Sequence, residues 1–130
     1  MLSNETYRNV LAFAVVGSLA FFVDAGVFTT LNTLGAGTLA SRCVSILASF
    51  TFTWYLNRTF TFRTTKPASF VEFLSYVGGM QIGLLTNFST FFVVLYLSDI
   101  AKAYPVIALA IATLAGMVIN FMVSRRILKK

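Results

Sequence analysis

The sequence predicts an all-α integral membrane protein with four transmembrane helices, arranged as two parallel repeated helical hairpins with both termini cytoplasmic. Hydrophobic residues make up 58% of the 130 residues, and charged residues only 11%, whereas a soluble domain carries about 25% charged residues. So few charges cannot cover the surface of a soluble domain of this size. An aromatic content of 15% also excludes a disordered chain.

Four apolar stretches account for most of the chain, and each exceeds the roughly 18 residues that are typical of a membrane span. They run over residues 10–32, 37–57, 71–97 and 104–124. The first stretch is too long for the apolar core of a signal peptide and is followed at once by another span, so we expect it to be retained. Pro105 suits the first turn of the fourth helix. We therefore expect one membrane domain over residues 1–130.

Basic residues are divided unequally between the two sides of this topology. Eight of the ten lysines and arginines fall on the side that holds both termini and the 58–70 loop: Arg8, Arg58, Arg63, Lys66, Arg125, Arg126, Lys129 and Lys130. The positive-inside rule places that side in the cytoplasm. The net charge of +6 thus follows membrane topology, and we expect no nucleic-acid partner.

The two halves of the chain resemble each other in short motifs. Residues 13–17 (FAVVG) open the first span, and residues 76–78 (YVG) lie at the matching place in the third. Spans two and four end in the similar segments 53–58 (TWYLNR) and 120–125 (NFMVSR). Two spans in each half give both halves the same orientation, which indicates a parallel repeat.

Two charged residues lie inside predicted spans, where charges are costly and usually face a partner or a cavity. At about 1.5 Å per residue, Asp24 lies roughly 12 Å and Arg42 roughly 8 Å below the outer boundary. The tight turn between their helices makes them antiparallel neighbours, so the two charges can meet. One interpretation is that the two residues form a structural ion pair. The other is that Arg42 binds an anionic lipid headgroup, while Asp24 orients Arg42 or exchanges with the headgroup. Both interpretations stay open.

A polar stripe follows the second span within an arc of about 120°. Its members are Arg42, Ser45, Ser49, Thr53 and Asn57, and span four has a similar set that includes Gly116, Asn120 and Ser124. These residues permit close helix packing, with hydroxyls bonded back to carbonyls, or they form a headgroup lane from Arg42 to Asn57 and Arg58. The segment 57–63 is likewise either an interfacial belt or a phosphate site, because arginine matches phosphate oxygens.

The sequence resembles the GtrA-like family. The resemblance rests on four spans in about 130 residues, the Phe13-x-x-x-Gly17 opening and the Asn57-Arg58-x-Phe60-x-Phe62 end of span two. It implies a flippase that moves a polyprenyl-phosphate-linked sugar from the cytoplasmic to the outer leaflet, as donor for cell-surface polysaccharide glycosylation. Asn57 and Arg58 take the family's Asn-Arg positions, and Arg125 is the second-half counterpart of Arg58.

The substrate-binding and translocation residues that we expect come from both halves of the chain: Asp24, Arg42, Asn57, Arg58, Asn120 and Arg125. The resemblance implies a multi-pass protein of the cytoplasmic (inner) membrane, with the sugar lipid and glycosyltransferases of the same pathway as partners. We also expect a homo-oligomer, with a dimer first among the options, from small-residue faces such as Gly79 and Gly83.

We expect neither catalysis nor a cofactor or metal. The chain has no histidine, one cysteine and only four acidic residues, and it lacks a Gly-rich phosphate-binding loop for ATP. Two alternatives to the flippase are a non-transporting membrane anchor that recruits a glycosyltransferase and a small multidrug-type cation exporter. The exporter is less favoured because Asp24 has a partner in Arg42, whereas such transporters use an unpaired carboxylate.

Overall fold

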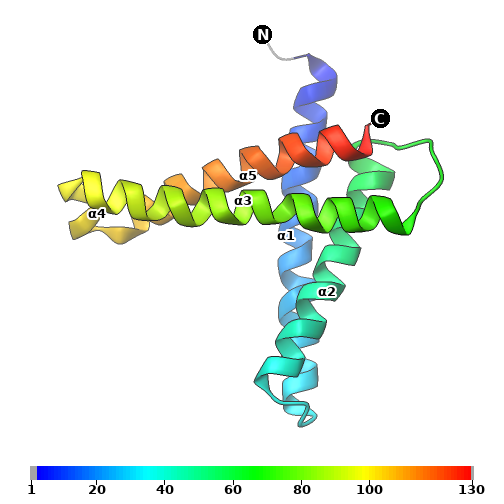
Figure 1. The fold of residues 1–130 in the computed structure, drawn as a ribbon, viewed down its shortest axis with the longest axis horizontal. Coiled ribbons are helices and arrows are strands. Elements are labelled where there is room, and N and C mark those ends of the chain that lie inside the picture. Colours follow the sequence, from blue (N-terminus) through cyan, green and yellow to red (C-terminus); the bar gives the residue numbers. More distant parts are fainter. Residues whose placement is uncertain (1–2, 130) are drawn as a thin grey trace. The chain divides into compact units, whose positions relative to one another are not determined.

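The computed structural model describes residues 3–129, and these residues form helices and connections without a strand (Figure 1). The elements in chain order are α1 (Asn4–Thr33), α2 (Thr38–Leu56), the π-helix η1 (Asn57–Thr61), α3 (Phe70–Leu97), α4 (Asp99–Ala103) and α5 (Pro105–Leu128). The chain divides after Ala68 into two compact units. The first holds α1, α2 and η1, and the second holds α3, α4 and α5. The all-α prediction is confirmed.

Helix α1 begins earlier than the apolar stretch that predicted it. Ser3 is its N-cap, and the Ser3 hydroxyl accepts a hydrogen bond from the Thr6 amide at 3.2 Å, which satisfies one of the free amides of the first turn. The helix ends before a tight turn in which Gly35 and Gly37 have φ angles of 90° and 86°. Only glycine adopts such angles without strain. The turn sends the chain back, so α2 packs antiparallel against α1.

The end of α2 differs from its prediction, because the expected 58–70 loop begins as a helix. The Phe62 amide donates to the Asn57 carbonyl at 2.8 Å, five residues back, which is the π-helical pattern. The chain then leaves the helix at Arg63, whose φ is 50°. The Thr64 amide reaches back to the Arg58 carbonyl at 2.8 Å.

The second unit is a hairpin in which α3 packs against α5, with α4 at the end where the two helices are joined (Figure 1). The Ser69 hydroxyl caps α3 by accepting from the Glu72 amide at 3.1 Å. The expected connection 98–103 is instead mostly the one-turn helix α4, because the Ser98 hydroxyl accepts from the Ala101 amide at 3.2 Å. Helix α5 begins at Pro105, as predicted.

Small residues bring α3 and α5 close together. A Cβ atom added to Gly79 would lie 2.3 Å from Val123 Cγ1, and one added to Gly83 would lie 1.7 Å from Asn120 Oδ1. The Gly79-x-x-x-Gly83 motif therefore packs against α5 of the same hairpin. A homo-oligomer stays a prediction, and within one copy of the chain both glycines face α5 of the same hairpin.

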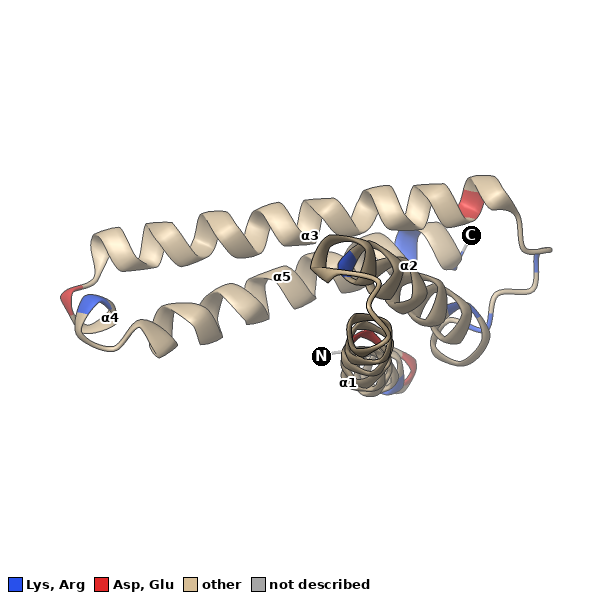
Figure 2. Cartoon of the chain, turned by 90° about the horizontal axis from the view of Figure 1, so that it is seen from below, with Lys and Arg blue, Asp and Glu red and all other residues tan. Residues whose placement is uncertain are grey.

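Three of the described helices are long and apolar enough to cross a membrane: α1, α3 and α5. The second unit carries no charged residue in 73–98 or 104–124, and its charges gather at the two ends of the hairpin (Figure 2). Helix α2 falls outside the three because it contains Arg42, three serines and three threonines. The chain is thus a membrane protein with several apolar helices.

Candidate functional site

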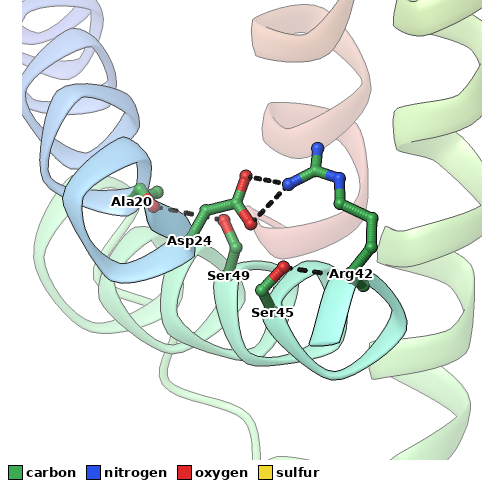
Figure 3. Close-up of polar contacts among 5 residues, drawn as sticks. All are labelled: Ala20, Asp24, Arg42, Ser45 and Ser49. Atoms are coloured by element: carbon green, nitrogen blue, oxygen red, sulfur yellow. Dashed lines mark hydrogen bonds and ion pairs between the residues drawn. The ribbon is translucent and has the colours of Figure 1, made fainter. Parts of the chain in front are cut away.

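The first unit brings the two predicted intramembrane charges together. Arg42 Nη1 lies 2.8 Å from both Oδ1 and Oδ2 of Asp24, so one guanidinium nitrogen bridges both carboxylate oxygens (Figure 3). This differs from the common two-nitrogen fork, in which each oxygen receives its own N–H. The contact joins α1 to α2 near the turn, as the antiparallel arrangement predicted.

The two partners of this ion pair are unequally exposed. The Asp24 side chain is 23% exposed and the Arg42 side chain 53%. Among the described residues, the guanidinium makes its hydrogen bonds through Nη1 alone, and arginine carries five N–H donors in total. Nε and Nη2 of Arg42 therefore present donors to the surroundings of the hairpin. An anion with two or three oxygens matches such a donor set.

The hydroxyls of the α2 stripe are engaged in helix packing. Ser45 Oγ donates to the Arg42 carbonyl at 3.0 Å, and Ser49 Oγ reaches across to the Ala20 carbonyl of α1 at 3.4 Å (Figure 3). Thr53 Oγ1 lies 3.1 Å from the Ser49 carbonyl. These contacts favour the packing interpretation for the middle of the stripe. They leave Arg42 as the stripe residue whose donors face outward.

Asn57 and Arg58 shape the loop that follows α2. Asn57 is 2% exposed, and its Oδ1 accepts a hydrogen bond from Thr61 Oγ1 at 2.9 Å. Arg58 Nη2 donates to the Lys66 carbonyl. Both side chains thus take part in contacts that hold η1 and the segment after it. These contacts give the two residues a positioning role, and the phosphate site that the arginine of this segment suggested stays a prediction.

Asn9 belongs to the same group and was missed by the sequence analysis. It is 1% exposed. When its side-chain amide is oriented so that both the oxygen and the nitrogen face suitable hydrogen-bond partners, Nδ2 donates to the Thr61 carbonyl at 2.8 Å and to the Glu5 carbonyl at 3.3 Å. This contact ties η1 to α1. The available signal was an asparagine next to the first apolar run, in a position where an amide must find a buried partner.

Asn120 and Arg125 lie in the second unit. Asn120 Oδ1 and Ser124 Oγ are buried and have no hydrogen-bond partner among the described residues. Asn120 packs on Gly83, as described above, and Arg125 is exposed near the end of α5. Of the six predicted site residues, Asp24 and Arg42 are paired directly and Asn57 and Arg58 share one loop, whereas Asn120 and Arg125 belong to a different unit.

Comparison with models of protein families gives a match that covers most of the chain. Residues 12–128 match the family model described as "GtrA/DPMS, transmembrane domain", and no curated protein matches the chain. The match spans most of the chain and both compact units, and it includes Asp24, Arg42 and the 57–62 segment. The chain therefore belongs to the GtrA/DPMS transmembrane-domain family.

Proposed function

We propose that the chain moves a polyprenyl-phosphate-linked sugar from the cytoplasmic to the outer leaflet, and that Arg42 binds the lipid phosphate during the passage. Membership of the GtrA/DPMS family supports a membrane protein related to sugar lipids. The observation that carries the proposal is the half-exposed guanidinium of Arg42, held by Asp24 through one nitrogen. The donors of this guanidinium that Asp24 leaves unused can bind a second anion, such as a lipid phosphate.

The proposal includes α2 as a fourth membrane span. Helix α1 can cross the membrane, and the glycine turn returns the chain directly alongside it. The 19 residues of α2 extend about 28 Å at 1.5 Å per residue, close to the roughly 30 Å of the hydrocarbon core. Four spans place both termini and the basic 58–70 loop on one side, which is the cytoplasm by the positive-inside rule.

The chemistry of the substrate matches what Arg42 offers. A polyprenyl-phosphate sugar carries one phosphodiester charge, and its long chain stays in the bilayer while the headgroup crosses. In a low-dielectric environment an arginine–phosphate contact is strong and directional. Asp24 neutralises Arg42 between transport events and exchanges with the phosphate during them. No bond is made or broken, so the role is transport, and consumption of the lipid outside draws it outward.

The direct experiment follows a labelled polyprenyl-phosphate sugar across liposomes that contain the purified chain. The wild type is expected to expose the lipid at the other leaflet faster than empty liposomes, and Arg42→Ala is expected to match the empty liposomes. Arg126→Ala is the matched control, because Arg126 is an exposed arginine near the end of α5 and is not among the predicted site residues; this variant should keep the wild-type rate. A folded wild type no faster than empty liposomes would favour the anchor alternative.

A further inference from the structure

A second feature lies at the α4 end of the second unit, apart from the residues of the proposed site. A wide, open cleft of about 890 Å³ lies there, where α4 joins α3 to α5 (Figure 1). Its walls include Phe92, Tyr96 and Leu97 of α3 and Pro105 of α5. Lys102 of α4 is the charged residue among those that line it. The cleft is therefore an apolar hollow with one cation at its edge.

The position of the cleft indicates what surrounds it. Helix α3 has 28 residues, which extend about 42 Å, whereas the hydrocarbon core of a bilayer is about 30 Å thick. Helix α3 is thus long enough for its last turns to reach the boundary between hydrocarbon and headgroups. Tyr96 and Tyr104, 80% and 65% exposed, are typical of that boundary. A cleft with apolar walls at this depth opens to lipid chains.

Lys102 is available to a headgroup. Its Nζ lies 3.5 Å from Asp99 Oδ1, and the two side chains are 55% and 100% exposed. A charge-assisted hydrogen bond from an ammonium group has a length of about 2.7–2.9 Å, so this pair is loose, and solvent screens it. The ammonium group can turn from Asp99 toward an anion above the cleft.

We propose that this cleft binds one anionic phospholipid of the bilayer, with an acyl chain along the apolar walls and the phosphate at Lys102. Charge complementarity selects an anionic lipid over a zwitterionic one. A phospholipid fits better than a sugar lipid because no asparagine, glutamine, serine or threonine lines the cleft to bind sugar hydroxyls. The proposal concerns a resident lipid and does not depend on translocation.

The test counts bound lipids by native mass spectrometry on the purified full chain, with phosphatidylglycerol and phosphatidylcholine as probes. Removing one positive charge at a membrane surface corresponds to about a fivefold loss of affinity, which we expect for phosphatidylglycerol with Lys102→Gln. Lys129→Gln, at the other end of α5, is the matched control and should bind as the wild type does. Asp99→Asn should raise phosphatidylglycerol binding, since it removes the carboxylate that competes for Lys102.

Filling the cleft separates chain binding from headgroup binding. Val93→Trp places a large ring on the cleft wall and keeps Lys102, and it is expected to lower phosphatidylglycerol occupancy while circular dichroism shows an unchanged helix content. Full occupancy in Val93→Trp would contradict the cleft as the site of the chain. Equal losses of phosphatidylglycerol binding in Lys102→Gln and Lys129→Gln would contradict a specific site at Lys102, because general surface charge would then explain the binding. Displacement of the lipid by millimolar inorganic phosphate would also overturn the proposal, because phosphate lacks the acyl chain.

Discussion

The contact between Gly83 and Asn120 allows a sharp test of how the second unit is packed. A Cβ atom at position 83 would lie 1.7, 2.3 and 2.8 Å from Oδ1, Cγ and Nδ2 of Asn120, so the whole amide group must move. Overpacking of this kind costs about 1–3 kcal/mol, and close approach at small residues is a main source of helix association in membranes. We expect Gly83→Ala to destabilise the hairpin by about 2 kcal/mol.

A second substitution at the same contact should restore the stability lost in Gly83→Ala. Asn120→Ala removes all three atoms that the new Cβ would meet, so the double variant should regain most of the lost stability. Double-variant cycles between residues in contact give interaction energies of about 0.5–3 kcal/mol. The assay is unfolding in detergent micelles followed by circular dichroism. Gly78→Ala is the matched control, because nothing lies within 4 Å of a Cβ at that position. It should be neutral, or stabilising by up to about 1 kcal/mol.

Two outcomes would refute this reasoning. A Gly83→Ala variant as stable as Gly78→Ala would show that Gly83 does not pack against α5. A double variant as unstable as Gly83→Ala alone would show that Asn120 is not the group that the Cβ meets.

Three further predictions concern the first unit. Gly37→Ala should destabilise the α1–α2 hairpin by about 1–3 kcal/mol, because Gly37 has a φ of 86° that alanine adopts only with strain; thermal unfolding measures this. Asn9→Ala should speed amide hydrogen exchange in η1, because it removes the bond to the Thr61 carbonyl, and unchanged exchange would contradict that link. Asp24→Asn should lower the amount of protein inserted in the membrane, because it leaves Arg42 without its anion. The free energy of inserting the unpaired arginine should be below the roughly 2.5–3.5 kcal/mol of an arginine at the centre of the membrane. Quantitative blotting of the membrane fraction tests the last prediction, and insertion equal to the wild type would contradict it.

Hydropathy predicted the helices well, because long apolar runs have few alternatives in a membrane. The starts of α2, α3 and α5 fall within one residue of the apolar stretches. The turn before α2 was also readable, since its glycines need positive φ. Helix α4 and the π-helix η1 were not predicted. Helix α4 depends on one serine cap, and η1 depends on a backbone bond five residues back and on Asn9 from another helix. Hydrophobic periodicity reveals neither a serine cap nor a backbone hydrogen bond of this kind, so it could not predict α4 or η1.

The candidate site was predictable only in part. Asp24 and Arg42 stood out because charges inside apolar spans are rare and the turn makes their helices neighbours. The choice between a packing stripe and an open lane was not predictable, since a serine suits both. The choice depends on which face of α2 packs against α1. The hydrogen bond from Ser49 to the Ala20 carbonyl shows that the serine face of α2 packs against α1. Gly79 and Gly83 likewise suit contacts within one hairpin or between copies, and the structure places α5 against them.

The measurement that tests the central claim most directly is the liposome assay on the charge-swapped variant Asp24→Arg/Arg42→Asp, beside the wild type and empty liposomes. The swap keeps an ion pair between α1 and α2 but moves the cation to the other helix. The proposed mechanism predicts a folded variant, with a melting temperature near that of the wild type, that moves the labelled sugar lipid no faster than empty liposomes. Transport at the wild-type rate by the swapped variant would contradict it, because Arg42 would then serve only as half of a structural pair.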